Sequence, residues 1–264
     1  MKDAIKSFLI LTCLVLILAF FGWSYARYRA LSTPLKPPLD HAFLRDLGAL
    51  SVIAYPRNQE VGDWTFLEKA SGLSSSVILW IDVRFRSEDR TLVVAREKNA
   101  IANAPKLTEV FERFPHHRLI LNVQGHQPDL IPSFIAVIED AQASDRLLIQ
   151  SPEKGFLTEM RQERPLWLYG TSLAQVTQLI MLSSLGLQPL APLRGDVLVV
   201  ENEEAFWRLN DRAISEALRR GMKVFAGPLK KKEQALELHQ RGVTGILISD
   251  PELMLELLRS ADAS

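Results

Sequence analysis

The chain has 264 residues, 47% of them hydrophobic, and its 31 basic and 31 acidic residues leave no net formal charge. This length suits one large domain or two small ones, and because no basic cluster stands out, the composition argues against a nucleic-acid partner. The single cysteine, Cys13, lies in an apolar N-terminal segment, so the rest of the chain has no thiol for a disulfide, a thiolate nucleophile or a zinc-thiolate site.

An uncharged apolar segment covers residues 7–26. As a helix it would extend roughly 30 Å, the thickness of the hydrocarbon core of a bilayer. Trp23, Tyr25 and Tyr28 gather at one end, as in an interfacial aromatic belt. The alternatives are a cleaved signal peptide, with Ser24-Tyr25-Ala26 as a weak cleavage site, and a buried helix. Length and uniform apolarity favour a retained anchor in the lipid bilayer.

This segment gives three predicted regions. Residues 1–30 form a single-pass N-terminal membrane anchor, residues 31–41 form a proline-containing linker, and residues 42–264 form one domain. Basic residues flank the anchor on both sides, so the charge pattern leaves the side of the membrane undetermined.

Beyond the linker, short apolar runs alternate with segments of helical spacing. Strands are expected at 50–55, 77–83 with a hairpin arm to 95, 118–124, 146–151, 165–172, 196–201, 222–227 and 245–250. Helices are expected at 64–72, 107–114, 131–142, 156–164, 173–187, 213–221, 233–242 and 252–260. Strict alternation of about eight strands and eight helices predicts a (β/α)₈ TIM-type barrel. An open doubly wound sheet is the alternative.

Charged residues gather where strands are predicted to end, which is where α/β proteins place their chemistry. Asp82 and Glu97 are candidate metal ligands there, although a carboxylate beside an arginine more often forms an ion pair. Arg57, Arg84 and Arg96 are candidate anion-binding residues, because guanidinium groups suit phosphate. The alternative for these arginines is a solvated surface or pairing with the two carboxylates.

His126 follows the third predicted strand on the same face and is a candidate catalytic base. A loop histidine without an identified partner is more often a surface residue. Trp80 is expected in the barrel core or the wall of a pocket.

The last predicted unit reads Gly-Val-Thr-Gly-Ile-Leu-Ile-Ser-Asp-Pro over residues 242–251. It resembles the closing strand of the glycerophosphodiester phosphodiesterase family, which reads Gly-Val-Asp-Gly-Ile, two apolar residues, Thr or Ser, Asp, x, Pro. Residues 217–224 resemble that family's penultimate unit. Residues 77–98 resemble its Glu-x-Asp-Val strand and the hairpin that ends Val-Val-x-His-Asp. The resemblance extends over the domain, from residue 42 to about 258.

The resemblance implies a TIM-type barrel that cleaves a glycerol phosphodiester with Ca²⁺ or Mg²⁺. Two histidines would act as acid and base, and the carboxylates of Glu-x-Asp and Glu-x-Lys would hold the cation, which offsets the developing phosphate charge. Here Tyr55 stands at the first histidine position and Arg96 at the second, with Glu97 following in place of Asp. Arginine effectively never deprotonates, so it cannot shuttle a proton near neutrality.

The expected ligand carboxylates are also replaced. Trp80-Ile81-Asp82 stands for Glu-x-Asp, so of that pair only Asp82 remains, and Asn122-Val123-Gln124 stands for Glu-x-Lys. We therefore expect a membrane-anchored, phosphodiesterase-like protein that is catalytically degenerate and binds a phosphate, a glycerophosphodiester or a phospholipid headgroup, or acts as a scaffold.

Two alternatives remain. One is an active phosphoric diester hydrolase of lipid metabolism with a rearranged site, in which Asp82 and Glu97 hold Ca²⁺ or Mg²⁺ and His126 or Tyr55 takes part in catalysis. The other is a structural membrane protein whose pocket is filled by side chains. No cofactor is assigned outside the hydrolase alternative.

Overall fold

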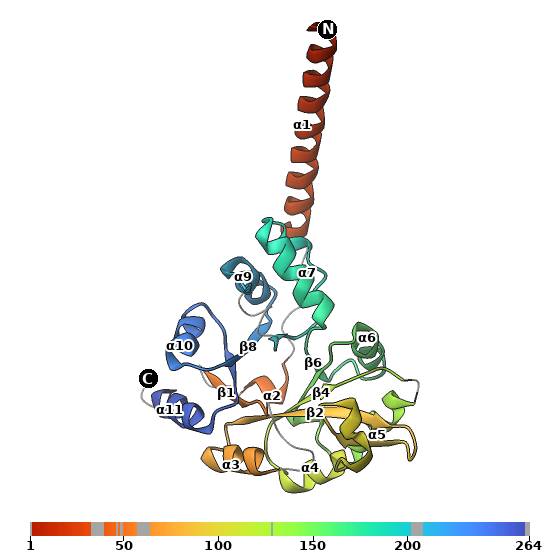
Figure 1. The fold of residues 1–264 in the computed structure, drawn as a ribbon, viewed down its shortest axis with the longest axis vertical. Coiled ribbons are helices and arrows are strands. Elements are labelled where there is room, and N and C mark those ends of the chain that lie inside the picture. The colour runs from red at the N-terminus through yellow and green to blue at the C-terminus, as the bar shows by residue number, and fades with distance from the viewer. Residues whose placement is uncertain are drawn as a thin grey trace.

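The computed structural model describes residues 2–32, 40–45, 47, 50–56, 64–127, 129–201 and 208–261. Figure 1 shows a ring of helices around a curved sheet, with the long helix α1 (Lys2–Ser32) leaving the ring beside α7. A short helix, α2 (Ala42–Arg45), follows, and its Phe43 is fully buried in the apolar cluster that the strands enclose. The linker predicted at residues 31–41 lies mostly outside the described residues.

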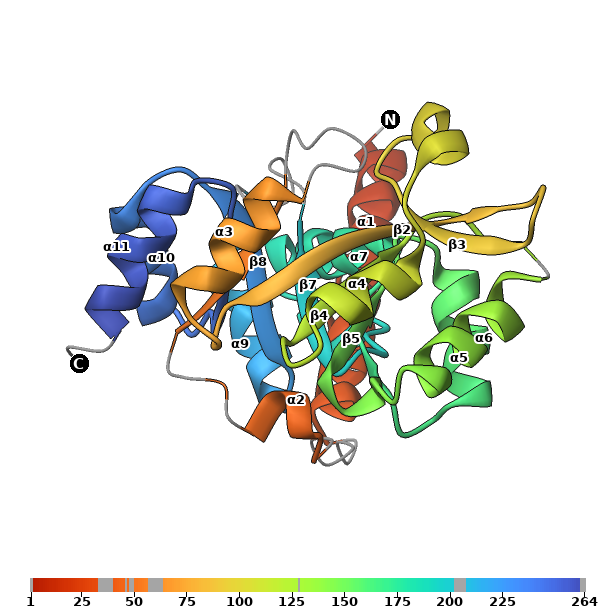
Figure 2. The same cartoon turned by 90° about the horizontal axis from the view of Figure 1, so that it is seen from below.

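Within the described part of the chain, eight strands pair in parallel in the order β6-β5-β4-β2-β1-β9-β8-β7. They are β1 (Ser51–Ala54), β2 (Ile78–Arg86), β4 (Leu119–Val123), β5 (Leu147–Gln150), β6 (Leu168–Tyr169), β7 (Val197–Val200), β8 (Lys223–Leu229) and β9 (Gly245–Ile248). The remaining strand, β3 (Thr91–Val94), pairs antiparallel with β2, and Figure 2 shows this hairpin reaching out beyond the sheet.

The outer face of the strands packs against helices in one large apolar cluster. The helices after α2 are α3 (Thr65–Leu73), α4 (Leu107–Arg113), α5 (Leu130–Asp140), α6 (Lys154–Glu163), α7 (Leu173–Ser184), α9 (Asp211–Arg219), α10 (Lys232–Gln240) and α11 (Pro251–Ala261), with 3₁₀ turns η1 (Lys98–Asn103), η2 (Ser144–Arg146) and η3 (Gln188–Leu190). Each predicted helix is present, with ends that shift by a few residues.

The sheet closes between β6 and β7 through one main-chain bond and two side chains. Asp196 donates its backbone N–H to the carbonyl of Tyr169 at 2.8 Å, and its carboxylate accepts from the Tyr169 N–H at 3.1 Å. The hydroxyl of Thr171 accepts from the backbone N–H of Val199 at 3.2 Å. These contacts give a nearly closed (β/α)₈ barrel, so the predicted TIM-type fold is confirmed and the open sheet is not formed.

The strand predicted at residues 165–172 is the least accurate expectation, because only Leu168–Tyr169 forms a strand. Here the carboxylate of Asp196 replaces one of the main-chain partners that would extend the ladder. The backbone at Gly195 also lies close to the backbone at Gly170, since a Cβ on Gly195 would lie 2.8 Å from the carbonyl oxygen of Gly170.

The barrel interior follows the two-residue period of the strands. Buried inward-facing residues form one apolar cluster, which is Phe43, Ile53, Tyr55, Ile78, Trp80, Ile120, Leu148, Leu168, Val197, Val199, Phe225 and Leu247. Because successive side chains on a strand point to opposite faces, the residue two positions after an inward residue also points inward. At the carboxyl ends of the strands this rule brings polar side chains into the barrel mouth.

Candidate functional site

The mouth of the barrel collects the polar side chains that continue the inward rows. Asp82 follows Trp80 on β2, Asn122 follows Ile120 on β4, and Glu201 directly after β7 continues the row of Val199. The register supports this grouping, because Asp82 of β2 pairs with Asn122 of β4 across the ladder.

These residues line one pocket of about 290 Å³. Its lining consists of Tyr55, Asp82, Arg96, Asn122, Gln124, Pro152, Leu173 and Glu201. The volume lies near the lower end of the range for small-molecule sites, so the pocket suits a small ligand. The interpretation that side chains fill the pocket therefore finds no support here.

A carboxylate–amide–carboxylate bridge spans the floor of the pocket. Asn122 donates from Nδ2 to Oδ1 of Asp82 at 2.7 Å and to Oε2 of Glu201 at 3.4 Å. The indole N–H of Trp80 donates to the same Oδ1 at 3.2 Å. Asp82 is 6% exposed and Asn122 is 1% exposed, so these hydrogen bonds are largely shielded from water.

Burial and, to a smaller extent, the nearby Asp82 carboxylate raise the pKa of Glu201 to about 7, against the charge of Arg96, which lowers it. Burial also raises the pKa of Asp82, against the hydrogen bond from Asn122 and the charge of Arg96, which lower it. Burial is the main cause for both groups because the interior disfavours the charged form. Glu201 therefore changes its protonation state near neutral pH.

Tyr55 and Arg96 form the other side of the pocket. Nη2 of Arg96 donates to the phenol oxygen of Tyr55, and its Nη1 donates to the carbonyl of Pro56 at 3.0 Å. The guanidinium also lies 4.9 Å from the centre of the Tyr55 ring, which packs edge-on against Trp80. Burial raises the pKa of Tyr55, so the phenol keeps its proton at neutral pH.

The three candidate anion-binding arginines have different places. Arg96 lines the pocket. Arg84 donates from Nε and Nη2 to the backbone carbonyl of Arg96, at 3.0 and 2.7 Å, and so supports the hairpin that carries Arg96. Arg57 lies outside the described residues.

The other two candidates lie away from the pocket. Glu97 is exposed and stands at the start of η1. His126 contacts Glu159 of α6, with 3.2 Å between Nε2 and Oε2, and its side chain is 33% exposed. Neither side chain is among those that line the mouth of the barrel.

Glu201 is a charged pocket residue that the sequence interpretation did not single out. The signal was present, since Val197, Val199 and Glu201 follow one another at the two-residue period of a strand and the last of them is polar. Asp82, Asn122 and Gln124 gave the same signal on their own strands.

The donor set around Asp82 does not fit the Ca²⁺ or Mg²⁺ ion that the resemblance implies. Such ions need several oxygen ligands, whereas Oδ1 of Asp82 faces the N–H groups of Asn122 and Trp80. Trp80 is fully buried in the inner cluster and has no oxygen to offer. Among the described residues, no group of three or more His, Cys, Asp or Glu side chains is arranged to hold a metal ion.

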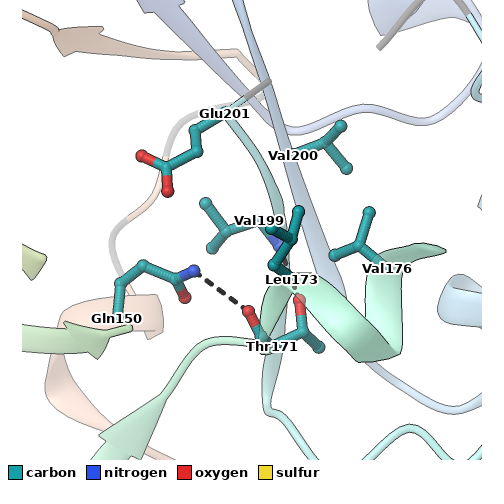
Figure 3. A pocket seen from close by; sticks show the side chains of 7 residues that line it. All are labelled: Gln150, Thr171, Leu173, Val176, Val199, Val200 and Glu201. Atoms are coloured by element: carbon teal, nitrogen blue, oxygen red, sulfur yellow. Dashed lines mark hydrogen bonds between the residues drawn. The ribbon is translucent and has the colours of Figure 1, made fainter. Parts of the chain in front are cut away.

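A second, much smaller cavity of about 20 Å³ lies beside the pocket and shares Leu173 and Glu201 with it. Figure 3 shows Gln150 reaching toward Thr171, to whose backbone carbonyl its Nε2 donates at 3.0 Å. Three valines from α7 and β7 complete the wall: Val176, Val199 and Val200. Figure 3 shows the carboxylate of Glu201 pointing away from Val176 and Val200.

One helix among the described residues is long and apolar enough to cross a membrane. Its candidate span is Lys6–Tyr25 in α1, which is exposed apart from the partly buried Trp23 and Ser24 near its end. The same properties are found in a signal sequence near an N-terminus.

No protein-family model matches the chain, and no curated protein sequence matches it significantly. Solved structures do match. A glycerophosphodiester phosphodiesterase from Parabacteroides distasonis is 17% identical with a TM-score of 0.60, over 82% of this chain and 99% of that one. A glycerophosphoryl diester phosphodiesterase domain from Mycobacterium tuberculosis is 13% identical with a TM-score of 0.62, over 79% and 99%.

A third match is an Oleispira antarctica phosphodiesterase in complex with the product sn-glycerol-3-phosphate. It is 17% identical with a TM-score of 0.58, over 81% of this chain and 97% of that one. Each of the three is thus covered almost completely. The chain has the TIM-barrel fold of the glycerophosphodiester phosphodiesterases, as its strand motifs suggested.

Proposed function

We propose that this chain is a membrane-anchored, phosphodiesterase-like barrel that binds a small phosphate-bearing ligand without metal-dependent hydrolysis. The observation that carries the proposal is the amide nitrogen of Asn122, which donates to Asp82 and Glu201. It puts hydrogen-bond donors between two carboxylates, where a hydrolase of this kind needs a cation. The partners of the protein are then the lipid bilayer and the ligand.

The charge distribution of the pocket supports this class of ligand. Arg96 supplies a permanent positive charge on one side, while Asp82, Asn122, Gln124 and Glu201 supply hydrogen-bonding groups on the other. A phosphate ester with free hydroxyl groups, such as glycerol phosphate, matches both sides, because the arginine binds the anion and the carboxylates and amides accept or donate to hydroxyls.

The residues at the two histidine positions favour binding over catalysis. Tyr55 keeps its proton because burial raises its pKa, and Arg96 stays charged. Neither can exchange a proton with a phosphodiester near neutral pH. Glu201 can, but it lies beside Asn122 and Asp82, and among the described residues no cluster of His, Cys, Asp or Glu is arranged to hold a metal ion that would polarise the phosphate.

The test uses the full chain in detergent micelles or nanodiscs. Calorimetry should give saturable binding of sn-glycerol 3-phosphate to the wild type, unchanged by Ca²⁺ or Mg²⁺, and loss of that binding in Arg96→Gln. The matched control is Arg90→Gln, because Arg90 is exposed and pairs with Asp129 outside the pocket. Glycerophosphocholine should remain intact in the presence of either cation.

Two results would contradict the proposal. Ca²⁺- or Mg²⁺-dependent release of glycerol 3-phosphate that Asp82→Ala abolishes would establish the hydrolase alternative. Absence of both turnover and saturable phosphate binding would leave a structural membrane protein.

A further inference from the structure

The end of α7 and the turn η3 carry large apolar side chains that the barrel does not cover. Met181 is 63% exposed, Leu185 is 68% exposed and Leu190 is 41% exposed. We call these three residues the α7 tip. Their neighbours Leu179 and Ile180 point the other way and are buried in the barrel, so the end of α7 carries apolar side chains on two sides although only one of them packs against protein.

The α7 tip lies beside the end of the candidate membrane span. Helix α1 contacts η3, and Figure 1 shows α1 leaving the ring of helices next to α7. Trp23, Ser24 and Arg27 of α1 are partly buried, whereas Tyr25 and Tyr28 are exposed. Residues 23, 24 and 27 share one helical face, so this face of α1 is the side turned toward the barrel.

This contact fixes the depth of the α7 tip. The candidate span of α1 ends at Tyr25, only after the partly buried Trp23 and Ser24. If α1 crosses a bilayer, its last apolar turn lies at the boundary between acyl chains and headgroups, where Trp and Tyr side chains gather. The part of the barrel in contact with that turn must lie at the same level.

We propose that the α7 tip is a second membrane-contact surface, which enters the interfacial layer of the bilayer that α1 spans. This proposal rests on the anchor in the proposed function. Burial of Met181, Leu185 and Leu190 among lipid headgroups and upper acyl chains removes apolar surface from water. The partner is thus a lipid surface, and its attachment to the barrel is continuous with the anchor.

The charges next to the α7 tip suit a lipid surface. Arg212 at the start of α9 is exposed, and its Nη1 lies 3.8 Å from the place of a Cβ on Gly186, between Leu185 and η3. On α1 the guanidinium of Arg27 lies 5.4 Å from the centre of the Trp23 ring. Cationic side chains around an apolar tip interact favourably with lipid phosphates.

The second contact also sets the orientation of the barrel. Figure 1 is viewed along the barrel axis, with the helices arranged as a ring, and α1 lies in the plane of the picture. The barrel axis and the axis of α1 therefore point in different directions. Figure 2, turned by 90°, shows α1 extending behind the strands. With α7 held at the bilayer, the barrel lies on its side and the pocket opens along the membrane surface.

Spin labels on the full chain in phospholipid nanodiscs test this contact. Met181→Cys and Leu185→Cys, each combined with Cys13→Ser, carry the label at the α7 tip. Glu112→Cys in the same background is the matched control, because Glu112 is exposed on α4, which lies on the far side of the ring from α1 in Figure 1. The wild type labelled at Cys13, in the middle of the candidate span, reports on the anchor itself.

The expected result is a shift in collision accessibility. Labels at 181 and 185 should be more accessible to oxygen and less accessible to a water-soluble nickel complex than the label at 112. The label at Cys13 should differ from the label at 112 in the same way. If Cys13 reports lipid while 181 and 185 match 112, the second contact is wrong and the anchor stands. Protection of 181 and 185 from both reagents would mean contact with protein and would also overturn the proposal. If Cys13 reports water, the anchor in the proposed function fails first.

Discussion

Asn122 holds together two acidic side chains that would otherwise repel each other. Its Nδ2 contacts Oδ1 of Asp82 and Oε2 of Glu201, and all three residues point into the barrel mouth. An oxygen in place of this nitrogen would face two acceptors, so Asp82 would keep only the indole N–H of Trp80 as a donor and Glu201 would lose the donor that Asn122 provides. We therefore expect the identity of this one amide to matter for the stability of the site.

Asn122→Asp should lower the free energy of unfolding by about 2–4 kcal/mol at pH 8, because a buried hydrogen bond becomes a third negative charge. The loss should be smaller at pH 5, where the raised pKa of Glu201 keeps that carboxyl protonated. Denaturant unfolding of the full chain at the two pH values measures the difference. Asn103→Asp, at an exposed residue of η1, should change little. An equal loss at both pH values would contradict this account.

Glu201 should make the wild-type chain less stable as the pH rises. The folded chain keeps the Glu201 proton up to about pH 7, whereas the unfolded chain releases it near 4.5, the ordinary pKa of a glutamate. Between these values the native state binds more protons than the unfolded state, so stability falls with rising pH. The fall is at most about 3.5 kcal/mol for this carboxyl, since one pKa unit corresponds to about 1.4 kcal/mol.

Glu201→Gln should flatten this pH dependence, because the amide does not titrate and its oxygen can still accept from Asn122. The variant should therefore exceed the wild type in free energy of unfolding at pH 8 and approach it at pH 5. Unfolding curves across this range provide the measurement. The exposed Glu163→Gln serves as a control with the wild-type profile. A Glu201→Gln chain that is less stable than the wild type at pH 8 would show that burial of this carboxyl is not the dominant effect.

At the scale of the elements, the alternation of apolar runs and helical segments was sufficient to predict the barrel. Each expected strand is present, because a strand buried on both faces reads as a continuous apolar run. The exception is β6, reduced to Leu168–Tyr169, where the side chain of Asp196 replaces a backbone partner. Such a substitution depends on how close two distant segments lie, which the local pattern does not contain.

The same distinction applies to the site. Asp82 was expected at a strand end, and the family resemblance singled out Asn122 and Gln124. All three line the barrel mouth, and the two-residue period of β7 could have identified Glu201 as well. The side chain with which each of these residues pairs could not be predicted from its spacing in the sequence. His126 follows a strand end, yet its side chain turns to Glu159 of α6. The position of a residue along a strand predicts how close its side chain lies to the barrel mouth. Which side chain it then contacts depends on the helix packed beside it.

The junction of β6 and β7 should be sensitive to a single added methyl group. In Gly195→Ala the new Cβ would lie 2.8 Å from both the carbonyl oxygen of Gly170 and Cγ2 of Thr171. The backbone must shift, so we expect a loss of about 1–3 kcal/mol in the free energy of unfolding. Gly72→Ala is the matched control, because a Cβ there meets nothing within 4 Å and alanine favours the α3 helix by roughly 0.5–1 kcal/mol. Similar stability of the two variants would contradict the close approach.

At the scale of the whole molecule, the apolar span and the barrel have different environments. Among the described residues, the span at Lys6–Tyr25 leaves most of its side chains exposed, including Phe8, Leu16 and Phe21 at 64% or more. Exposed apolar surface of this extent is unfavourable in water. A bilayer removes that cost, and retention of the span would keep the barrel beside the membrane.

Retention of the span is testable against signal-peptide cleavage near Ala26. We expect the mature protein to stay in the membrane pellet after alkaline carbonate extraction, with an intact mass that includes Cys13. Leu14→Arg combined with Leu18→Arg should move it to the soluble fraction, because each arginine near the centre of a span costs roughly 2.5–3.5 kcal/mol on insertion. Leu31→Arg, beyond the span, should leave the protein in the pellet. A mature chain that begins after Ala26 would instead identify α1 as a signal sequence, and the barrel would then have neither its anchor nor a fixed orientation toward the bilayer.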